Sequence, residues 1–276
     1  MSIWTKIRNE CILLEDEAIL VLNKPAGLSV MGERHETDLV KSAQDTGEQL
    51  FPVHRIDKVT SGAVLFAKEL RFHGDLTRQF NKRLVDKAYL VLTRSRGLPE
   101  RGTIDLPLSE GRKSRIRVAA QRSSIVADDS GNHWSVAPSD VFTQVATYPS
   151  ITTFARVWED EHHSLLVVRP ITGRRHQIRV HLAWIGHPIE GDPLFDKERA
   201  SRPARTFLHS WRVAFNAAWL GGTRIDVEAP PEDDFWSPVR ECLPGGTPAT
   251  VIEHARRQIA ELRVRRRRPM RSTAAE

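Results

Sequence analysis

The chain has 276 residues, of which 40% are hydrophobic and 28% are charged, and its two cysteines lie far apart. This composition is that of a soluble protein with a core, and it excludes a membrane-spanning helix, a disulfide scaffold and a cysteine zinc site. The net charge of +6 is concentrated in residues 256–271, which carry +7 and leave −1 for the rest, so a nucleic-acid surface on the body must be a local patch.

The N-terminal third predicts short strands that alternate with helices. Residues 12–23 predict a hairpin, because two apolar runs flank an acidic turn, and the segment KPAG at 24–27 ends its second strand. Proline cannot donate to a strand ladder, and glycine permits the bend. The elements expected next are a loop with a short helix at 32–48, a strand at 64–67, a helix at 72–83 and a strand at 88–93.

The rest of the chain predicts further strands and two more helices. Residues 95–150 are rich in Gly, Ser, Pro and Asp, which indicates short strands and surface loops. Strands interleaved with a few helices favour an α+β fold over a doubly wound sheet. We expect one domain over 1–255, then an Arg-rich helix end and a disordered tail at 256–276. The later elements expected are strands at 151–158, 164–169 and 206–215, a surface wrap at 230–238 and a helix at 248–262.

One of these helices is expected directly after Thr172, which suits an N-cap with the first helical turn at 173–175. Gly186 stands where a helix commonly ends. Within this helix Arg175 and Arg179 are four residues apart and would share a face. The free N–H groups of its first turn would suit an anion. Taken alone, the pattern describes a surface amphipathic helix with solvated arginines.

Residues 54–68, HRIDKVTSGAVLFAK, place a histidine, an arginine and an aspartate within four residues, just before an apolar strand. Taken alone, Asp57 would be a turn cap for Thr60 and Ser61. We expect His54 to be a structural histidine whose hydrogen bonds are satisfied by the fold.

Together these segments resemble the RluA-type pseudouridine synthases. The resemblance covers about residues 12–216. It implies an enzyme that isomerises particular uridines in structured RNA to pseudouridine, with no metal or organic cofactor. The implied fold is a mixed, mainly antiparallel central sheet flanked by helices, with an RNA-binding cleft. The segments that carry the resemblance, in order, are VLNKPAGLSV, HRIDKVTSGAVLFAK, KAYLVL, GRRHQIRVHLAWIGHPIEGDPLF and FLHSWRVAF.

The resemblance also assigns catalytic residues. Asp57 matches the family's catalytic aspartate, and Arg179 matches the basic residue that pairs with it. Tyr89 matches the aromatic residue that stacks on the target uracil and is implicated in deprotonation. Residues 1–255 would then form a single catalytic domain.

A second group of matched residues would contact the RNA. Arg55 would occupy the space vacated by the flipped base, and Ile178 would form an apolar wall of the pocket. Arg175 and His176 are expected to touch the substrate. For Lys24 two roles stay open, binding of an RNA phosphate or support of the catalytic loop.

The implied chemistry requires an ionised carboxylate. The N-glycosidic bond must break, the base must rotate, and a bond must form to C5. Asp57 would either attack the sugar C1′ or take a sugar proton, and both routes stay open. Burial would raise the pKa of this carboxylate above its ordinary value of about 3.9, so a permanently charged arginine partner is needed to keep it dry and ionised.

Two other functions compete with this interpretation. A catalytically silent RNA-binding protein would share the cleft but not the turnover. A glycoside hydrolase would need two carboxylates, and the motifs offer one acid among cations. We expect a cytoplasmic monomer that meets no membrane and acts on ribosomal or transfer RNA. The Arg-rich tail and Arg34 are candidates for further RNA contacts.

Overall fold

A long mixed sheet forms the centre of the molecule. The computed structural model describes residues 2–32, 38–94, 97–196 and 205–262. In this part of the chain the pairs β4–β14 and β10–β6 are parallel, and the other pairs of this sheet are antiparallel. The predicted α+β fold with a mixed, mainly antiparallel sheet is therefore confirmed. Its strands run in the order β1 (Ile12–Glu15), β2 (Ile19–Lys24), β4 (Ser61–Ala67), β14 (Leu208–Ala217), β5 (Asp86–Thr93), β13 (Ser164–Pro170), β12 (Ile151–Glu159), β6 (Arg101–Asp105), β10 (His133–Val136) and β9 (Ile125–Ala127), while β15 (Thr223–Glu228) pairs with β14 and β3 (Phe51–Pro52) with β4.

A smaller sheet of three strands lies beside it. The region 97–150 thus contains short strands and loops, as its composition predicts. The strands of the smaller sheet, in spatial order, are β11 (Thr147–Tyr148), β7 (Leu108–Glu110) and β8 (Ile116–Val118).

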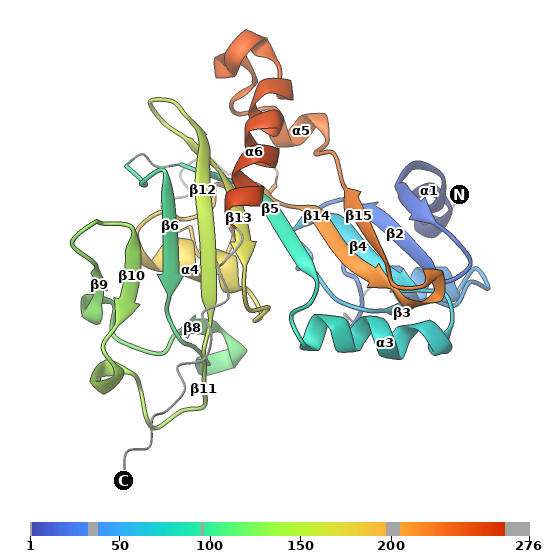
Figure 1. Cartoon of the computed structure of the whole chain (residues 1–276), viewed down its shortest axis with the longest axis horizontal. Helices are drawn as coiled ribbons and strands as arrows, with labels where there is room; N and C mark the ends of the chain where they lie inside the picture. Colours follow the sequence, from blue (N-terminus) through green and yellow to red (C-terminus); the bar gives the residue numbers. More distant parts are fainter. Residues whose placement is uncertain (1, 33–37, 95–96, 197–204, 263–276) are drawn as a thin grey trace.

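Helices pack on both halves of the long sheet. Figure 1 shows α3 along the half that contains β4 and β14, and α4 against β6 and β12 in the other half. Near the N-terminus, α1 and α2 share one apolar core with β2 and β4, while α5 and α6 share another with β5, β12 and β13. The helices are α1 (Ile3–Glu10), α2 (Leu39–Gln44), α3 (Leu70–Asn81), α4 (Gln177–Trp184), α5 (Asp233–Trp236) and α6 (Ala249–Glu261).

Strand alternation on β5 brings Tyr89 to the junction of two cores. Ala88 and Leu90 pack into the core beneath α6. Val91 packs on the other side, into the core beneath α4. Tyr89 touches both this core and the one formed by α1 and α2. Successive residues therefore serve opposite faces, and the tyrosine is held where the halves of the sheet meet.

The helix α4 begins later than the sequence predicts. It starts at Gln177, and its N-cap is His176 in a left-handed conformation with φ of +55°, not Thr172. The hydroxyl of Thr172 instead donates to Gln177 Oε1 at 2.7 Å and accepts from the backbone N–H of Ile151 at 2.9 Å. These bonds close a turn that a continuous helix could not contain.

This shift separates two arginines that were predicted to share a helical face. Arg175 lies before α4 and is exposed, whereas Arg179 lies within it and is buried. The predicted anion site in a first turn at 173–175 is wrong for the same reason, since those residues are not helical.

The segment 230–238 also differs in part from the prediction. Most of its residues are exposed, as predicted, but it contains the short helix α5, whose Phe235 and Trp236 are buried in the core beneath α6. The predicted final helix is confirmed as α6, and Arg256 within it pairs with Glu228 at 2.9 Å. Arg34 and residues 263–276 lie outside the described residues.

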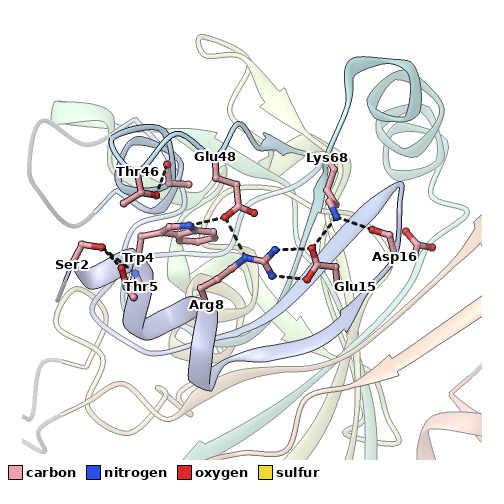
Figure 2. A network of polar contacts seen from close by, with 10 residues as sticks. Ser2, Trp4, Thr5, Arg8, Glu15, Asp16, Thr46, Glu48 and Lys68 are labelled. Atoms are coloured by element: carbon pink, nitrogen blue, oxygen red, sulfur yellow. Dashed lines mark hydrogen bonds and ion pairs between the residues drawn. The ribbon is translucent and has the colours of Figure 1, made fainter.

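Near the N-terminus, a compact polar network ties α1 to the first hairpin. Arg8 binds Glu15 with both terminal guanidinium nitrogens, at 2.6 and 2.7 Å, and its Nε donates to Glu48 at 3.2 Å. Lys68 donates to Glu15 at 2.8 Å, and the Trp4 indole donates to Glu48 at 2.8 Å (Figure 2). Each of these acids receives two partners, so the network satisfies its own charges.

Candidate active site

A cavity of about 910 Å³ opens at the junction marked by Tyr89. This volume lies at the upper end of the range for ligand pockets. Its walls come from the segments 29–32, 53–60, 80–89, 170–179 and 193–194, together with Leu208. Asp57 is the one acid among the described residues that line it. The lysines and arginines that line it number seven, namely Arg55, Lys58, Arg83, Lys87, Arg174, Arg175 and Arg179.

Arg179 joins Asp57 to a second carboxylate. Its Nη1 donates to Asp57 Oδ2 at 2.8 Å, while its Nε and Nη2 bind the two oxygens of Asp192 at 2.7 and 2.9 Å. The ion pair expected between Asp57 and Arg179 is therefore present. Burial opposes the charge of Arg179, but its hydrogen bonds to Asp192 and its attraction to both carboxylates outweigh that cost and raise its pKa.

Asp192 is a residue that the sequence interpretation missed. Its side chain is fully buried, and it also accepts the backbone N–H groups of Leu194 and Phe195 at 2.9 and 3.1 Å. It therefore anchors the guanidinium and fixes the direction of Nη1 toward Asp57. Arg179 donates only one of its nitrogens to Asp57, and a buried arginine with nitrogens to spare needs a further acid. That need was the one reason to look for a second carboxylate.

Asp57 is less enclosed than predicted. Its side chain keeps 24% of its surface exposed, against 3% for Arg179. The carboxylate was expected to be dry, but it faces the open cavity. Arg179 holds it in place, and a bound substrate would have to complete its isolation from water.

Tyr89 is a protonated phenol in this cavity. Burial raises its pKa to about 12, helped by the nearby charge of Asp57, while a hydrogen bond with Ser210 acts in the opposite direction. At neutral pH the hydroxyl therefore keeps its proton. The ring is suited to stack on a base, and action as a general base would first require loss of that proton.

Lys24 lies inside the fold, away from the surface where an RNA phosphate could reach it. The residue is fully buried, and its Nζ donates to the carbonyls of Pro25 and Leu28, both at 2.8 Å, and of Lys58 at 3.4 Å. Burial lowers the pKa of Lys24 to about 7, with the Arg205 charge acting the same way and the Asp57 charge opposing it. Of its two candidate roles, these contacts favour support of the loop that carries Asp57 over binding of a phosphate.

His176 lies beside the carboxylate rather than at the rim. Its Nε2 is 3.7 Å from Asp57 Oδ1, and its ring meets Phe195 edge to face at 5.9 Å between centroids. Burial lowers the pKa of His176, although the charge of Asp57 opposes the shift. Its Nδ1 is buried and has no hydrogen-bond partner among the described residues. Ile178 is nearly buried and lines the same wall of the cavity.

Two other predicted RNA contacts are exposed cations. Arg55 lines the cavity two residues from Asp57. Arg175 also lines it, and its Nη1 donates to the Ser114 carbonyl at 3.4 Å. This bond ties the turn before α4 to the loop between β7 and β8. Both side chains can therefore reach a ligand from the cavity rim.

Two residues near the site have structural roles. His54 accepts the Leu65 N–H at 3.1 Å and stacks on Phe80 at 4.5 Å, which confirms the expected structural histidine. Burial lowers its pKa to about 3, so it stays neutral. Gly62 brings β4 against β14, because a Cβ there would lie 2.3 Å from the Ser210 carbonyl oxygen.

The described residues form neither a metal-binding cluster nor a membrane-spanning helix. Among the described residues, no three His, Cys, Asp or Glu side chains gather closely enough to hold a metal ion. No helix in the described ranges has the length and apolarity needed to cross a bilayer.

Comparison with known proteins gives consistent matches. A family model described as RNA pseudouridylate synthase matches residues 18–184. Ribosomal large subunit pseudouridine synthase C of Pasteurella multocida is 32% identical over 236 residues, a match that covers 80% of this chain and 65% of that relative. The dual-specificity RNA pseudouridine synthase RluA of Escherichia coli O157:H7 is 32% identical over 204 residues, which cover 72% of this chain and 83% of that relative.

Solved structures have the same fold. Human RNA Pseudouridylate Synthase Domain Containing 4 has a TM-score of 0.66 at 22% identity, covering 91% of this chain and 95% of that chain. Human RNA Pseudouridylate Synthase Domain Containing 1 has a TM-score of 0.64 at 22% identity, and the match covers 91% of this chain and 96% of that chain. At this identity the likeness concerns the fold.

Proposed function

The chain belongs to the RNA pseudouridylate synthase family, and we propose that it converts uridine to pseudouridine in ribosomal or transfer RNA with the Asp57 carboxylate as its nucleophile or base. The observation that carries the proposal is the ion pair of Asp57 with Arg179, inside a cavity where the other charged residues described are cations. An RNA strand is a polyanion, and such a lining attracts it.

The proposed reaction moves one bond of the uridine. The bond from C1′ to N1 breaks, the uracil turns, and C1′ bonds to C5. The C5 hydrogen then leaves as a proton and N1 takes up a proton, so the product is an isomer of the substrate. Asp57 either forms a transient bond to C1′ or takes a sugar proton. In both cases Arg179 stabilises the carboxylate, and it does so without moving, because Asp192 already holds it.

The base must leave its stack to react, which costs a few kcal/mol. Tyr89 would recover part of that cost by stacking on the uracil. Ile178 and Val59, which both line the cavity, would exclude water from the broken glycosidic bond. Without such exclusion the sugar would be hydrolysed rather than rejoined to the base.

The two competing functions receive less support. A glycoside hydrolase needs a second carboxylate across the bond, and Asp57 is the one carboxylate in the described lining of the cavity. Asp192 does not supply it, because this acid is fully buried and bound to Arg179. A silent RNA-binding protein would have no need to hold a carboxylate in register with an anchored arginine.

The relatives suggest the substrates. One is named for the large ribosomal subunit and others for dual specificity on RNA, so both ribosomal and transfer RNA are candidates. We expect the protein to act on structured RNA as a cytoplasmic monomer. No organic cofactor or metal is required by the proposed steps.

Tritium release tests the proposal directly. Unmodified ribosomal and transfer RNA, each labelled with tritium at uridine C5, would be incubated separately with the wild type and with Asp57→Ala. We expect release from at least one RNA by the wild type, and a loss of at least about 10³-fold in the variant. Circular dichroism and RNA binding should be unchanged in Asp57→Ala, because Arg179 retains Asp192. Normal turnover by the variant would overturn the role of Asp57.

A further inference from the structure

Lys87 is a cation of the cavity whose role the proposed reaction does not explain. It lies on β5 two residues before Tyr89, and both side chains line the cavity. Among the described residues no carboxylate pairs with Lys87. Burial, followed by the nearby charge of Arg83, lowers its pKa to about 8, and no acid contributes to the shift. At neutral pH it is thus a largely charged group kept partly from water without a counterion.

The adjacent acid does not serve Lys87. Asp86 precedes it on the strand, and consecutive strand residues point to opposite faces. Asp86 binds Arg169 through Oδ1 and Arg224 through Oδ2, the latter at 2.7 Å. The strand therefore engages Asp86 with two arginines on one face and leaves Lys87 without an acid partner among the described residues on the other.

The surroundings of Lys87 hold its ammonium group in the cavity. A Cβ added to Gly173 would lie 3.2 Å from Lys87 Nζ, so the glycine leaves room for this group against the turn before α4. Arg83 approaches from the turn after α3, in a left-handed conformation with φ of +57°. Arg83 is exposed and forms no ion pair within the described ranges. Two cations thus converge on one side of the cavity.

We propose that Lys87 and Arg83 bind a backbone phosphate of the RNA, next to the uridine whose base stacks on Tyr89. The proposal rests on the proposed function and names a contact within it. Residues two apart on a strand are separated by about 6.6 Å, which is the scale of one nucleotide. A phosphate there would give both cations an anionic partner, and its fixed distance from Tyr89 would align the sugar with Asp57.

Substitution at Lys87 tests the contact. Lys87→Met keeps the length and removes the charge, while Lys87→Arg keeps a charge. Lys82→Met is a matched control, because Lys82 is exposed at the end of α3 and does not line the cavity. We expect the Kd for substrate RNA to rise about fivefold to tenfold in Lys87→Met, and its slope against salt to fall by about one. Lys82→Met should stay within about twofold of the wild type, and Lys87→Arg should keep the wild-type salt slope because it keeps the charge.

A change in the RNA separates a phosphate contact from a structural effect. Uncharged methylphosphonates would be placed, one at a time, at the phosphates flanking the target uridine. One position should weaken binding to the wild type and cause a smaller further loss in Lys87→Met, where Arg83 alone would still contact the phosphate. Equal losses in both proteins, or no sensitive position in the wild type, would overturn the contact. Tritium release by the wild type on the unmodified RNA keeps this outcome distinct from failure of the proposed reaction.

Discussion

The network around Glu15 and the cavity around Asp57 use the same residue types, but the network has equal numbers of acids and cations whereas the cavity has an excess of cations. In the network of Figure 2 two acids, Glu15 and Glu48, meet two cations, Arg8 and Lys68, in direct contacts. In the cavity seven described lysines and arginines surround Asp57 alone. The first region neutralises itself, whereas the described lining of the second carries more cations than acids and would attract an anionic ligand.

This difference separates structural arginines from binding ones. Many arginines of the body have an acid partner within the fold, whereas Arg55, Arg83, Arg174 and Arg175 at the cavity form no ion pair within the described ranges. An exposed ion pair adds only a small amount to the free energy of unfolding. An unpaired charge is available to an anion, and in a cleft it raises the local concentration of a charged substrate. The paired arginines of the body include Arg101, Arg169, Arg205, Arg212 and Arg256.

Arg179 is paired with two acids like the structural arginines, yet it also lines the cavity, so its replacement should have the largest effect among the arginines compared. Arg179→Lys keeps the charge but cannot bridge Asp57 and Asp192 at once. We expect kcat to fall about 100-fold, since a small displacement of a reacting group costs that much. The measurement is tritium release under single-turnover conditions. Arg212→Lys, which alters an exposed pair with Asp226, is the matched control and should keep the wild-type rate. A wild-type rate in Arg179→Lys would show that the fork is unnecessary.

Asp192→Asn tests whether the charge of the buried anchor matters apart from its shape. The amide keeps the shape but leaves the Arg179 charge with Asp57 as its one acid partner among the described residues. Breaking a buried pair costs about 3 kcal/mol or more in the free energy of unfolding. We expect that loss in denaturant unfolding, together with a fall in kcat of about tenfold. Unchanged stability with a large loss of kcat would instead assign Asp192 a direct part in the reaction.

Sequence alone went far toward the reacting groups. Asp57, Tyr89 and Arg179 stand in separate motifs, and the family resemblance brings them into one site before any coordinates. The pairing of Asp57 with Arg179 is present at 2.8 Å. What carried the prediction was residue type at a fixed place in a motif, which does not depend on local backbone detail.

Burial and local side-chain bonding could not be predicted in the same way. Lys24 was equally consistent with phosphate binding and loop support, because a sequence does not show that three backbone carbonyls surround an ammonium group. The start of α4 was misplaced because Gln177 reaches back to Thr172, a bond between side chains five residues apart. Asp192 was missed because its partner lies thirteen residues earlier, across the end of the helix.

The Arg-rich C-terminal segment, which lies outside the described residues, is a further candidate for unpaired cations that bind RNA. Removal of residues 263–276 takes away six arginines. A cut after His254 would be uninformative, since Ala255 and Ile259 are buried in the core beneath α6. We expect a chain ending at Leu262 to bind RNA several-fold more weakly at low salt and with a flatter salt dependence. Fluorescence anisotropy at several salt concentrations measures both, and identical slopes would exclude the tail from RNA binding.

The smallest effect is expected where charges already balance. Glu15→Gln should lower the free energy of unfolding by roughly 1 kcal/mol and leave tritium release unchanged. The hydrogen bond from Arg8, more than that from Lys68, lowers the pKa of Glu15 from 4.5 to about 2. Its folded pKa lies below its unfolded value, so the stabilisation is present above about pH 4.5 and is lost as the pH falls toward 2. The stability difference between wild type and Glu15→Gln should therefore disappear at about pH 2. A difference that persisted there would mean that the glutamate stabilises the hairpin through packing rather than charge, and the contrast between the two regions would then rest on the cavity alone.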